Sequence, residues 1–256
     1  MKLTVLGCGA STGVPAIGPN WGHCDPAEPR NRRRRASVLI EKDGVAILID
    51  MSPDLREQLI DAGVKRLDAV VMTHAHADHL HGIDDIRQLN RLMKAAIPLW
   101  ADASTLAEIG RRFGYALSPP DEPGRFYKPT LEPHPITGAF TVAGVTLVPF
   151  AQDHGFSTTL GFRIGKFAYS TDVTELDETA FATLQGVEVW VVDCMRRAPH
   201  PTHSHLDKTL GWIERVRPRR AILTHMDHTL DYRSLAAELP AGVEPGYDGL
   251  AIQLSD

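Results

Sequence analysis

Short apolar runs, rich in Val and Ile and separated by turn residues, recur along the whole chain. Runs of this length bounded by Gly, Pro, Asn or Asp are typical of β-strands. The first half predicts strands at Leu3–Leu6, Ser37–Ile40, Val45–Ile49 and Ala69–Met72. The second half predicts strands at Val145–Phe150, Leu160–Ile164, Phe167–Ser170, Val187–Val192 and Ala221–Thr224.

Apolar residues at three- and four-residue spacing predict helices between these strands. The predicted helices are Pro53–Ala62, Asp84–Lys94, Leu106–Phe113, Leu206–Val216 and Tyr232–Leu239. Strands followed by helices in both halves predict an α/β protein, in which two mixed sheets with helices outside form an αββα sandwich. The Pro- and Gly-rich segment Ser118–Pro135 predicts a surface excursion between the halves, so we expect residues 1–256 to form a single domain.

The composition is that of a globular protein, because 43% of the 256 residues are hydrophobic and 23% are charged. It excludes a disordered chain, collagen and a coiled coil. The formal net charge of -5 provides no general attraction to nucleic acid or to anionic lipid. The basic run of Arg30 and Arg32–Arg35 is a local exception, which we interpret either as a solvated face or as a contact for phosphate.

Three cysteines, Cys8, Cys24 and Cys194, are too few and too scattered for a disulfide framework, which favours a reducing, cytoplasmic setting. The opening run Met1–Leu6 is too brief for the apolar region of a signal peptide. No run approaches the roughly 20 apolar residues of a membrane span. We therefore expect a soluble protein with no membrane partner.

Histidine is unusually frequent, with 12 residues, and its densest cluster is Thr73–His79, directly after a predicted strand. This cluster offers four candidate ligands: His74, His76, Asp78 and His79. Alternate residues point in different directions, so two adjacent ions suit them better than one. His74 and His76 would face one ion, and Asp78 and His79 the other. Imidazole and carboxylate ligands suit zinc, manganese or iron.

Three further residues, His154, Asp172 and His225, each follow a predicted strand. The loops after such strands gather at one end of the sheets, so these residues complete the predicted site. We predict that His74, His76 and His154 bind one metal ion, that Asp78, His79 and His225 bind another, and that Asp172 bridges the two. The predicted cofactor is two divalent ions per chain, manganese or zinc.

The motif His74-x-His76-x-Asp78-His79, followed by His154, Asp172 and His225, resembles the metallo-β-lactamase superfamily over nearly the whole chain. The resemblance implies an αββα sandwich with a dinuclear centre between the sheets. It does not identify the substrate, because this superfamily performs many reactions. An aspartate that bridges the metals, as proposed for Asp172, is typical of phosphodiesterases, RNase Z and thioesterases, and argues against a β-lactamase.

The opening segment Leu6–Pro15 resembles both RNase Z and the phosphoribosyl 1,2-cyclic phosphate phosphodiesterase group. The latter group is also similar in the order and spacing of Asp193–Cys194, His200–His203, Leu223–His228 and Gly246–Gly249. The resemblance implies a hydrolase of a small phosphodiester, such as a cyclic phosphate or a related nucleotide. RNase Z is the alternative. A nucleic-acid substrate is disfavoured by the negative net charge, and the sequence shows no insertion comparable to the arm with which RNase Z grips tRNA. A nucleotide-binding module with little turnover is the non-enzymatic alternative.

Two cations can activate a water and neutralise phosphoryl oxygens, while an imidazole protonates the leaving group. In an ungapped match to His225, the catalytic histidine of the phosphodiesterase group falls on His203, and His205 is the competing candidate. The predicted catalytic residues are therefore His203 and the metal ligand Asp78. His203 and Arg87 are the predicted substrate contacts, although an ion pair of Arg87 with Asp84 is the alternative.

Asp50 and His228 are predicted to orient metal-binding imidazoles. The phosphodiesterase group also has a Cys-rich structural zinc site, for which this chain offers only His23, Cys24 and His228, so a third zinc is left open. A homodimer is left open too. Two dications held by Asp78 and Asp172 would make the mouth of the site positive, which is compatible with an anionic substrate.

Overall fold

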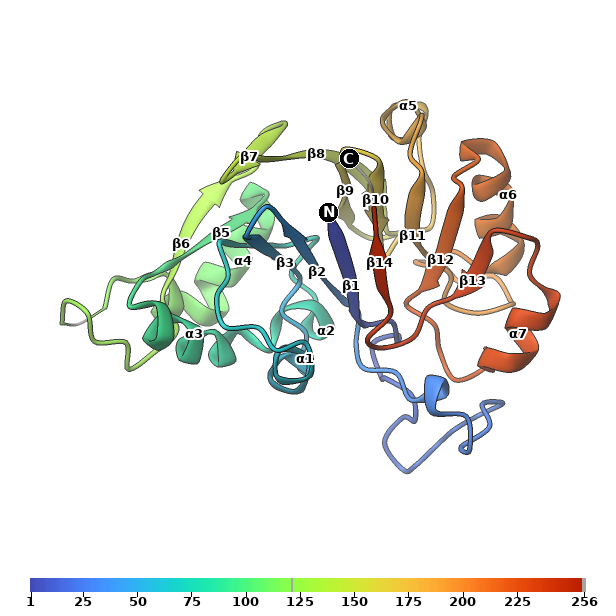
Figure 1. Cartoon of the computed structure of the whole chain (residues 1–256), viewed down its shortest axis with the longest axis horizontal. Helices are drawn as coiled ribbons and strands as arrows, with labels where there is room; N and C mark the ends of the chain where they lie inside the picture. The colour runs from blue at the N-terminus through green and yellow to red at the C-terminus, as the bar shows by residue number, and fades with distance from the viewer. Residues whose placement is uncertain (121, 255–256) are drawn as a thin grey trace.

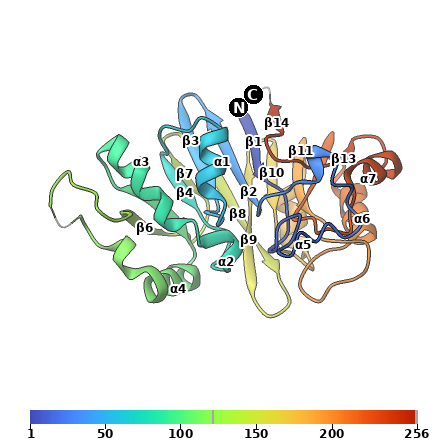
Figure 2. The same cartoon turned by 90° about the horizontal axis from the view of Figure 1, so that it is seen from below.

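The computed structural model describes residues 1–120 and 122–254, and in that part of the chain the strands form two seven-stranded sheets that face each other. The first sheet has the order β14-β1-β2-β3-β4-β5-β6, and the second has the order β13-β12-β11-β10-β9-β8-β7. Helices lie on the outer sides of both sheets, as Figures 1 and 2 show. The αββα sandwich predicted from the sequence is confirmed.

The first sheet contains seven strands in the described residues, antiparallel from β14 to β3 and parallel from β3 to β6. These strands are β1 (Lys2–Gly7), β2 (Ser37–Lys42), β3 (Val45–Ile49), β4 (Ala69–Val71), β5 (Ile97–Ala101), β6 (Leu131–Pro135) and β14 (Ala251–Gln253). The helices of this half are η1 (Pro29–Asn31), α1 (Leu55–Asp61), α2 (Ala77–Leu80), η2 (Ile83–Asp85), α3 (Ile86–Met93), α4 (Ala103–Phe113) and η3 (Gly114–Leu117).

The second sheet is antiparallel from β7 to β10 and parallel from β10 to β13. Its strands are β7 (Phe140–Val142), β8 (Val145–Asp153), β9 (Thr158–Ile164), β10 (Phe167–Ser170), β11 (Val189–Asp193), β12 (Arg220–Thr224) and β13 (Val243–Pro245). The helices of this half are α5 (Glu178–Leu184), α6 (Leu206–Val216) and α7 (Tyr232–Glu238).

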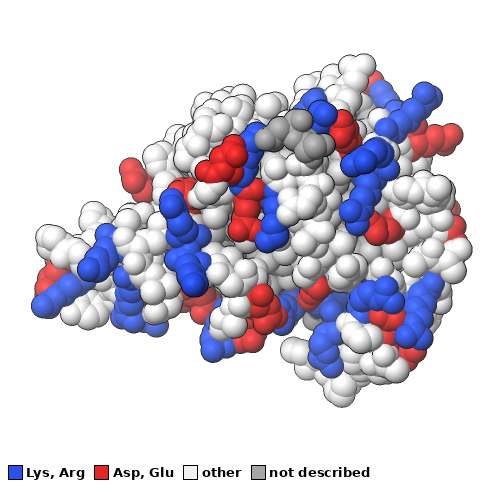
Figure 3. Space-filling view, in the orientation of Figure 1, with Lys and Arg blue, Asp and Glu red and all other residues white. Residues whose placement is uncertain are grey.

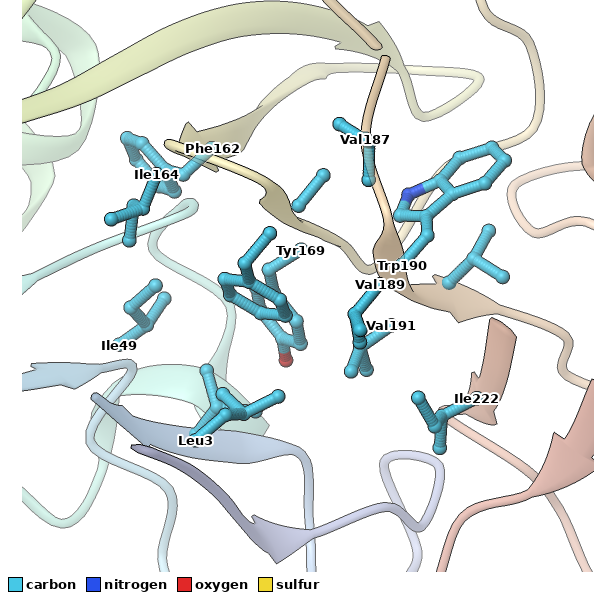
Figure 4. Packing of buried hydrophobic residues seen from close by; sticks show 14 of the residues in the cluster. Leu3, Ile49, Phe162, Ile164, Tyr169, Val187, Val189, Trp190, Val191 and Ile222 are labelled. Carbon is cyan, nitrogen blue, oxygen red and sulfur yellow. The ribbon is translucent and has the colours of Figure 1, made fainter. Parts of the chain in front are cut away.

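Apolar side chains from both sheets meet in one buried cluster between them. Leu3 and Ile49 come from the first sheet, and Phe162, Tyr169 and Ile222 come from the second (Figure 4). A second cluster, which includes Leu48, Leu55, Ile86 and Leu99, fills the space between the first sheet and its helices. Each fully buried large aliphatic or aromatic side chain stabilises the fold by about 1.5–3 kcal/mol relative to exposure, so the two clusters stabilise the strands that carry the polar residues described below.

Every predicted strand and helix has a counterpart, but several elements were not predicted. These are strands β5, β6, β7, β13 and β14, and helices α2 and α5, together with the short 3₁₀ helices. The prediction that Ser118–Pro135 is wholly a surface excursion is wrong at its end, where β6 pairs with β5. Its two prolines are tolerated because β6 lies at the edge of the sheet.

The parallel strands β3 and β4 of the first sheet, and β10, β11 and β12 of the second, present their carboxyl ends at the same edge of the sandwich. Polar residues lie at or within two positions of each of these ends, and the loops that carry them lie together at the lower edge in Figure 1. In the part of the chain that the structure describes, no helix has the length and apolar character needed to cross a membrane.

Candidate metal centre

The structure brings the seven predicted ligands together at this shared edge. One group consists of His74, His76, His154 and Asp172, whose ligand atoms all lie within 4.8 Å of one another. The other consists of Asp78, His79, Asp172 and His225, with the same spacing. Asp172 belongs to both groups, as the sequence predicts. The geometry therefore fits two adjacent ions, and ion binding itself stays a prediction.

The carboxylate of Asp172 lies between the two groups of imidazoles. Its Oδ1 is 3.8 Å from Nε2 of His74 and 3.7 Å from Nε2 of His154. Its Oδ2 is 3.0 Å from Nε2 of His79 and 3.5 Å from Nε2 of His225. Each oxygen thus faces one group, which is the arrangement required of a bridging ligand.

Backbone strain accompanies the polar residues that follow these strands. Asp50, Asp172 and His225 have φ values of 66°, 54° and 56°, in the left-handed region that most residues with a Cβ avoid. Such positions cost of order 1–3 kcal/mol and persist only where the surroundings hold them. Around Asp172, Thr159 Oγ1 donates to the backbone carbonyl at 2.9 Å and Thr171 Oγ1 donates to Oδ2 at 2.7 Å. The sharp turns direct these side chains into the site.

Hydrogen bonds at Nδ1 orient three of the imidazoles. His79 Nδ1 is 2.7 Å from Asp50 Oδ2, His154 Nδ1 is 2.6 Å from the carbonyl oxygen of Thr202, and His74 Nδ1 is 3.0 Å from Thr73 Oγ1. The Nε2 atoms of these rings then face Asp172. That of His74 is buried without a hydrogen-bond partner. Buried nitrogen atoms without a partner are rare, and imidazoles held in this way suit divalent ions such as zinc or manganese.

Charges at the centre are unevenly distributed in the absence of metal. Burial lowers the pKa of His74 and of His154, so both rings are neutral. Burial acts to lower the pKa of His79 and of His225, but nearby carboxylates, Asp172 above all, outweigh this effect. The pKa of His79 is therefore raised well above its usual value, and that of His225 is raised to about 9. The pKa of Asp172 is held well below its usual range, because the surrounding imidazolium charges outweigh the effect of its burial.

Asp78 has a lowered pKa for the same reason, since the neighbouring charge of His79 and the hydrogen bond from His225 outweigh burial. The metal-free centre therefore holds protons on His79 and His225 beside two ionised carboxylates. Metal ligands must be neutral imidazoles, so cations would replace these protons.

His203 lies inside the cluster, whereas His205 does not contact it. His203 Nε2 is 3.8 Å from Asp172 Oδ1, and its ring stacks on that of His225 with the ring centroids 4.6 Å apart. His205 is the residue that precedes helix α6, and its backbone bridges to Arg196. Of the two candidates for the general acid, the geometry favours His203.

Asp193 is a site residue that the sequence reasoning missed. It is fully buried at the end of β11, with Oδ2 3.5 Å from His203 Nδ1 and Oδ1 3.8 Å from His225 Nδ1. Ser204 N also donates to Oδ2 at 3.0 Å. The rule that identified Asp172 and His225, a polar residue at the end of an apolar strand, applies equally to Asp193. One carboxylate therefore faces the Nδ1 atoms of two imidazoles.

Arg87 is not brought to the centre, although it was predicted to contact substrate. Its Nη1 donates to the carbonyl oxygen of Tyr127 at 3.2 Å, on the exposed side of α3. Arg112, in the last turn of α4, lies instead against the loop that carries His74 and His76, here called the metal loop. It donates from Nη2 to the carbonyl oxygen of Ala75 in that loop. With His74 and His76 it lines a pocket of about 370 Å³. The helical spacing placed Arg87 near the loop but could not show which way its helix faces.

His228 was predicted to orient a metal-binding imidazole, but it lies away from the centre. Its carbonyl oxygen accepts from His23 N at 2.8 Å, and its ring faces Gly22. Within the described residues, His23, Cys24 and His228 do not form a group with the spacing of metal ligands.

The buried guanidinium of Arg33 occupies this region. It donates to the carbonyl oxygens of Asp227 at 3.0 Å and Leu230 at 2.6 Å, and Nη1 lies 3.9 Å from Cys24 Sγ. The basic run is therefore not a uniformly solvated face.

Comparisons with known proteins agree with this geometry. A model of the beta-lactamase superfamily domain matches residues 46–226. A solved diphosphatase from the PhnP family superposes with a TM-score of 0.91 at 35% identity, covering 99% of this chain and 98% of that one. Zinc-bound PqqB from Methylobacterium extorquens shares the fold, with a TM-score of 0.76 at 17% identity over 99% of this chain and 100% of that one.

Two curated relatives differ in how much of their own length this chain spans. An octanoyltransferase of Porphyromonas gingivalis is 33% identical over 253 residues, which are 98% of this chain, yet the chain spans only about half (51%) of that protein. A ribonuclease Z of a Mycobacterium species is 27% identical over 86% of this chain and 90% of its own length.

An αββα sandwich that gathers histidines and aspartates at one edge of its sheets defines a class of metal-dependent hydrolases. The chain belongs to that class, the metallo-β-lactamase superfamily, and is related to its phosphodiesterases.

Proposed function

We propose that this protein is a dinuclear metal-dependent hydrolase that cleaves a small phosphodiester. The substrate class is a cyclic phosphate, such as a phosphoribosyl 1,2-cyclic phosphate, or a related nucleotide. The observation that carries the proposal is the position of Asp172 between two groups of imidazoles. The likeness to a PhnP-family diphosphatase and to ribonuclease Z supports chemistry at phosphorus, because both names describe attack on a phosphoryl group.

The side chains have separate tasks in this reaction. His74, His76 and His154 would hold one cation, Asp78, His79 and His225 the other, and Asp172 both. When bound, the two cations lower the pKa of a water and neutralise the charge that develops on the phosphoryl oxygens. His203 donates a proton to the leaving oxygen, since a sugar alkoxide is a poor leaving group. The Asp193 carboxylate lies 3.5 Å from His203 Nδ1 and favours a proton on that ring, whose Nε2 faces the centre.

Hydrolysis of phosphodiesters by the purified, metal-loaded protein tests the proposal. Manganese and zinc forms would be assayed on bis(p-nitrophenyl) phosphate and on a 2′,3′-cyclic nucleotide. Asp172→Ala is expected to abolish both activities, and His203→Ala to slow cleavage of the cyclic nucleotide about 100-fold or more, with His205→Ala as the matched control. Full activity in the Asp172→Ala and His203→Ala variants would refute it. Tight nucleotide binding without turnover would indicate the non-enzymatic binding module.

A diphosphate is the second candidate substrate, which the 35% identity to the diphosphatase favours. The leaving group is then a phosphate, which needs less help from an acid than a sugar oxygen does. His203→Ala should therefore slow cleavage of a cyclic nucleotide much more than cleavage of a nucleoside diphosphate. Cleavage of precursor tRNA in the same assay would instead support the ribonuclease Z alternative.

Octanoyl transfer is not proposed, because the match covers only half of that relative. A cytoplasmic location stays a prediction, which the three buried free cysteines favour because a reducing compartment keeps thiols unpaired. A small anionic substrate also stays a prediction, and the question of a homodimer stays open.

A further inference from the structure

The five imidazoles proposed as metal ligands differ in how their rings are held. The ring of His76 is exposed, and among the described residues no hydrogen bond reaches either of its nitrogen atoms. It only packs against the rings of His74 and His154, with the ring centroids 4.5 and 5.2 Å apart. Three of the other rings are hydrogen-bonded at Nδ1, and that of His225 faces Asp193. The position of His76 therefore depends on the backbone that carries it.

Arg112 reaches this backbone from helix α4. Its Nη2 donates to the carbonyl oxygen of Ala75, the residue between the proposed ligands His74 and His76 in the metal loop. Within the part of the chain that the structure describes, Ala75 makes no other hydrogen bond. One side chain therefore fixes the peptide group that joins Ala75 to His76.

Helix α4 gives Arg112 a rigid base. Asp102 caps its first turn, where Oδ1 accepts from Thr105 N at 2.7 Å. Ile109, three residues before Arg112, is fully buried in the apolar cluster between the first sheet and its helices. The helix lies beside α2, which follows the metal loop (Figure 2). A donor on this helix therefore holds Ala75 in a fixed position relative to the sheet.

The other nitrogen atoms of the guanidinium also face the protein. Nε is 3.0 Å from Glu108 Oε1, and Nη1 is 3.4 Å from His81 Nε2. The Arg112 side chain is 23% exposed, against 69% for Arg111, which pairs with the same carboxylate. A planar guanidinium that is engaged on three sides is held in one orientation.

Ordinary surface arginines of this protein are different. On the face shown in Figure 3, lysine and arginine side chains lie beside carboxylates at the surface. Exposed pairs of that kind contribute little to stability. Arg112 instead joins a helix to the backbone of the metal loop, and none of its nitrogen atoms is left for a substrate phosphate. Its contacts suit it to hold the loop.

We propose that Arg112 is a positioning residue, which holds the metal loop in the geometry that lets His76 reach its ion. The inference rests on the proposed dinuclear function and concerns the ion of the first three histidines of the site: His74, His76 and His154. Without the guanidinium, the peptide after Ala75 can rotate, and the exposed imidazole then samples orientations that do not reach the ion. The other ion should be little affected, since its two imidazoles face the buried carboxylates of Asp50 and Asp193.

Stepwise zinc titration of the metal-free, full-length protein against a competing chelator tests this role. His76→Ala identifies the binding step that belongs to the first three histidines. Arg112→Met removes the guanidinium but keeps an apolar stem. Arg111→Met is the matched control, since Arg111 also pairs with Glu108 but, among the described residues, makes no hydrogen bond or ion pair with the metal loop.

We expect Arg112→Met to weaken the step that His76→Ala removes by roughly 10- to 100-fold and to leave the other step unchanged. Arg111→Met should leave both steps unchanged. Arg112→Lys keeps a cationic donor on a flexible stem, so it should bind the first ion more tightly than Arg112→Met does.

A folded Arg112→Met protein with wild-type affinity at both steps would overturn this inference and leave the dinuclear function intact. Equal weakening of both steps would overturn it too, since a general loss of structure would explain that result. A wild-type protein that binds one ion only would overturn the dinuclear function and this inference together.

Discussion

The hydrogen bond between Asp50 and His79 should control how tightly the centre holds metal. Asp50 is fully buried and uses both oxygens: Oδ1 accepts from Thr73 N at 2.8 Å, and Oδ2 accepts from Thr73 Oγ1 at 2.8 Å and from His79 Nδ1 at 2.7 Å. The carboxylate therefore keeps the proton of a neutral His79 on Nδ1. Nε2 is then left as the free nitrogen that faces Asp172.

Asp50→Asn keeps the shape of the side chain but cannot satisfy all three donors. If the amide NH₂ faces Thr73 N, two donors meet in a buried position. If it faces His79 Nδ1, the imidazole must accept there and carry its proton on Nε2, where a metal would bind. Hydrogen bonds to charged groups contribute about 1.5–3 kcal/mol, and loss of such a partner typically weakens metal binding roughly 10- to 100-fold. We expect a loss in this range for Asp50→Asn.

Competition of zinc or manganese with a fluorescent chelator measures this affinity directly. Asp248→Asn is the matched control, since it replaces another aspartate that accepts two backbone hydrogen bonds but contacts no proposed ligand. Circular dichroism checks that both variants fold. An Asp50→Asn protein that is folded and binds metal as tightly as wild type would refute the reasoning about the tautomer of His79.

Three other predictions concern protons and the arginine core. His203→Ala should lower kcat on a cyclic nucleotide about 100-fold or more with little change in KM, whereas His205→Ala should leave both near wild type; steady-state kinetics that show equal losses would contradict the assignment. The pKa of His225 is about 9 and that of His79 is also raised, so zinc binding at pH 7.5 should release about two protons. The number released should fall as the pH rises past 9. Calorimetry in buffers of different ionisation enthalpy measures this proton release, and a binding enthalpy that does not depend on the buffer would contradict it. Arg33→Met leaves the carbonyl oxygen of Asp227 without a donor and that of Leu230 with only the weak Cys24 thiol donor. We therefore expect roughly 2 kcal/mol lower stability and a lower Tm in thermal unfolding. An unchanged Tm would show that this guanidinium is dispensable.

Strands that are long and apolar were predictable, and short or proline-containing strands were not. β3 and β4 are continuous apolar runs because both faces of the first sheet are covered, by the second sheet and by helices. β5 contains Pro98, and β6 contains Pro133 and Pro135, so neither has a clear pattern. These strands form because neighbouring strands provide backbone hydrogen-bond partners. The local sequence gives little indication of such partners.

The proposed ligands were predictable because parallel strands end at a common edge, and a polar residue directly after an apolar run must lie there. Spacing along the chain was therefore sufficient to identify His74, His154, Asp172 and His225 as candidate ligands. Asp193 obeys the same rule, but in the sequence it contributed only to a family resemblance and was assigned no role at the site.

The sequence by itself determined the layers of the fold and the set of side chains at its edge, since apolar periodicity and strand ends are local properties. Only the tertiary structure decided which oxygen of Asp172 faces which imidazole, that Arg112 and not Arg87 lies beside the metal loop, and that Arg33 is buried while Arg32 is exposed. These outcomes depend on contacts between segments distant in the chain, as between Arg33 and Leu230. Neither spacing nor composition encodes the direction in which such a side chain points.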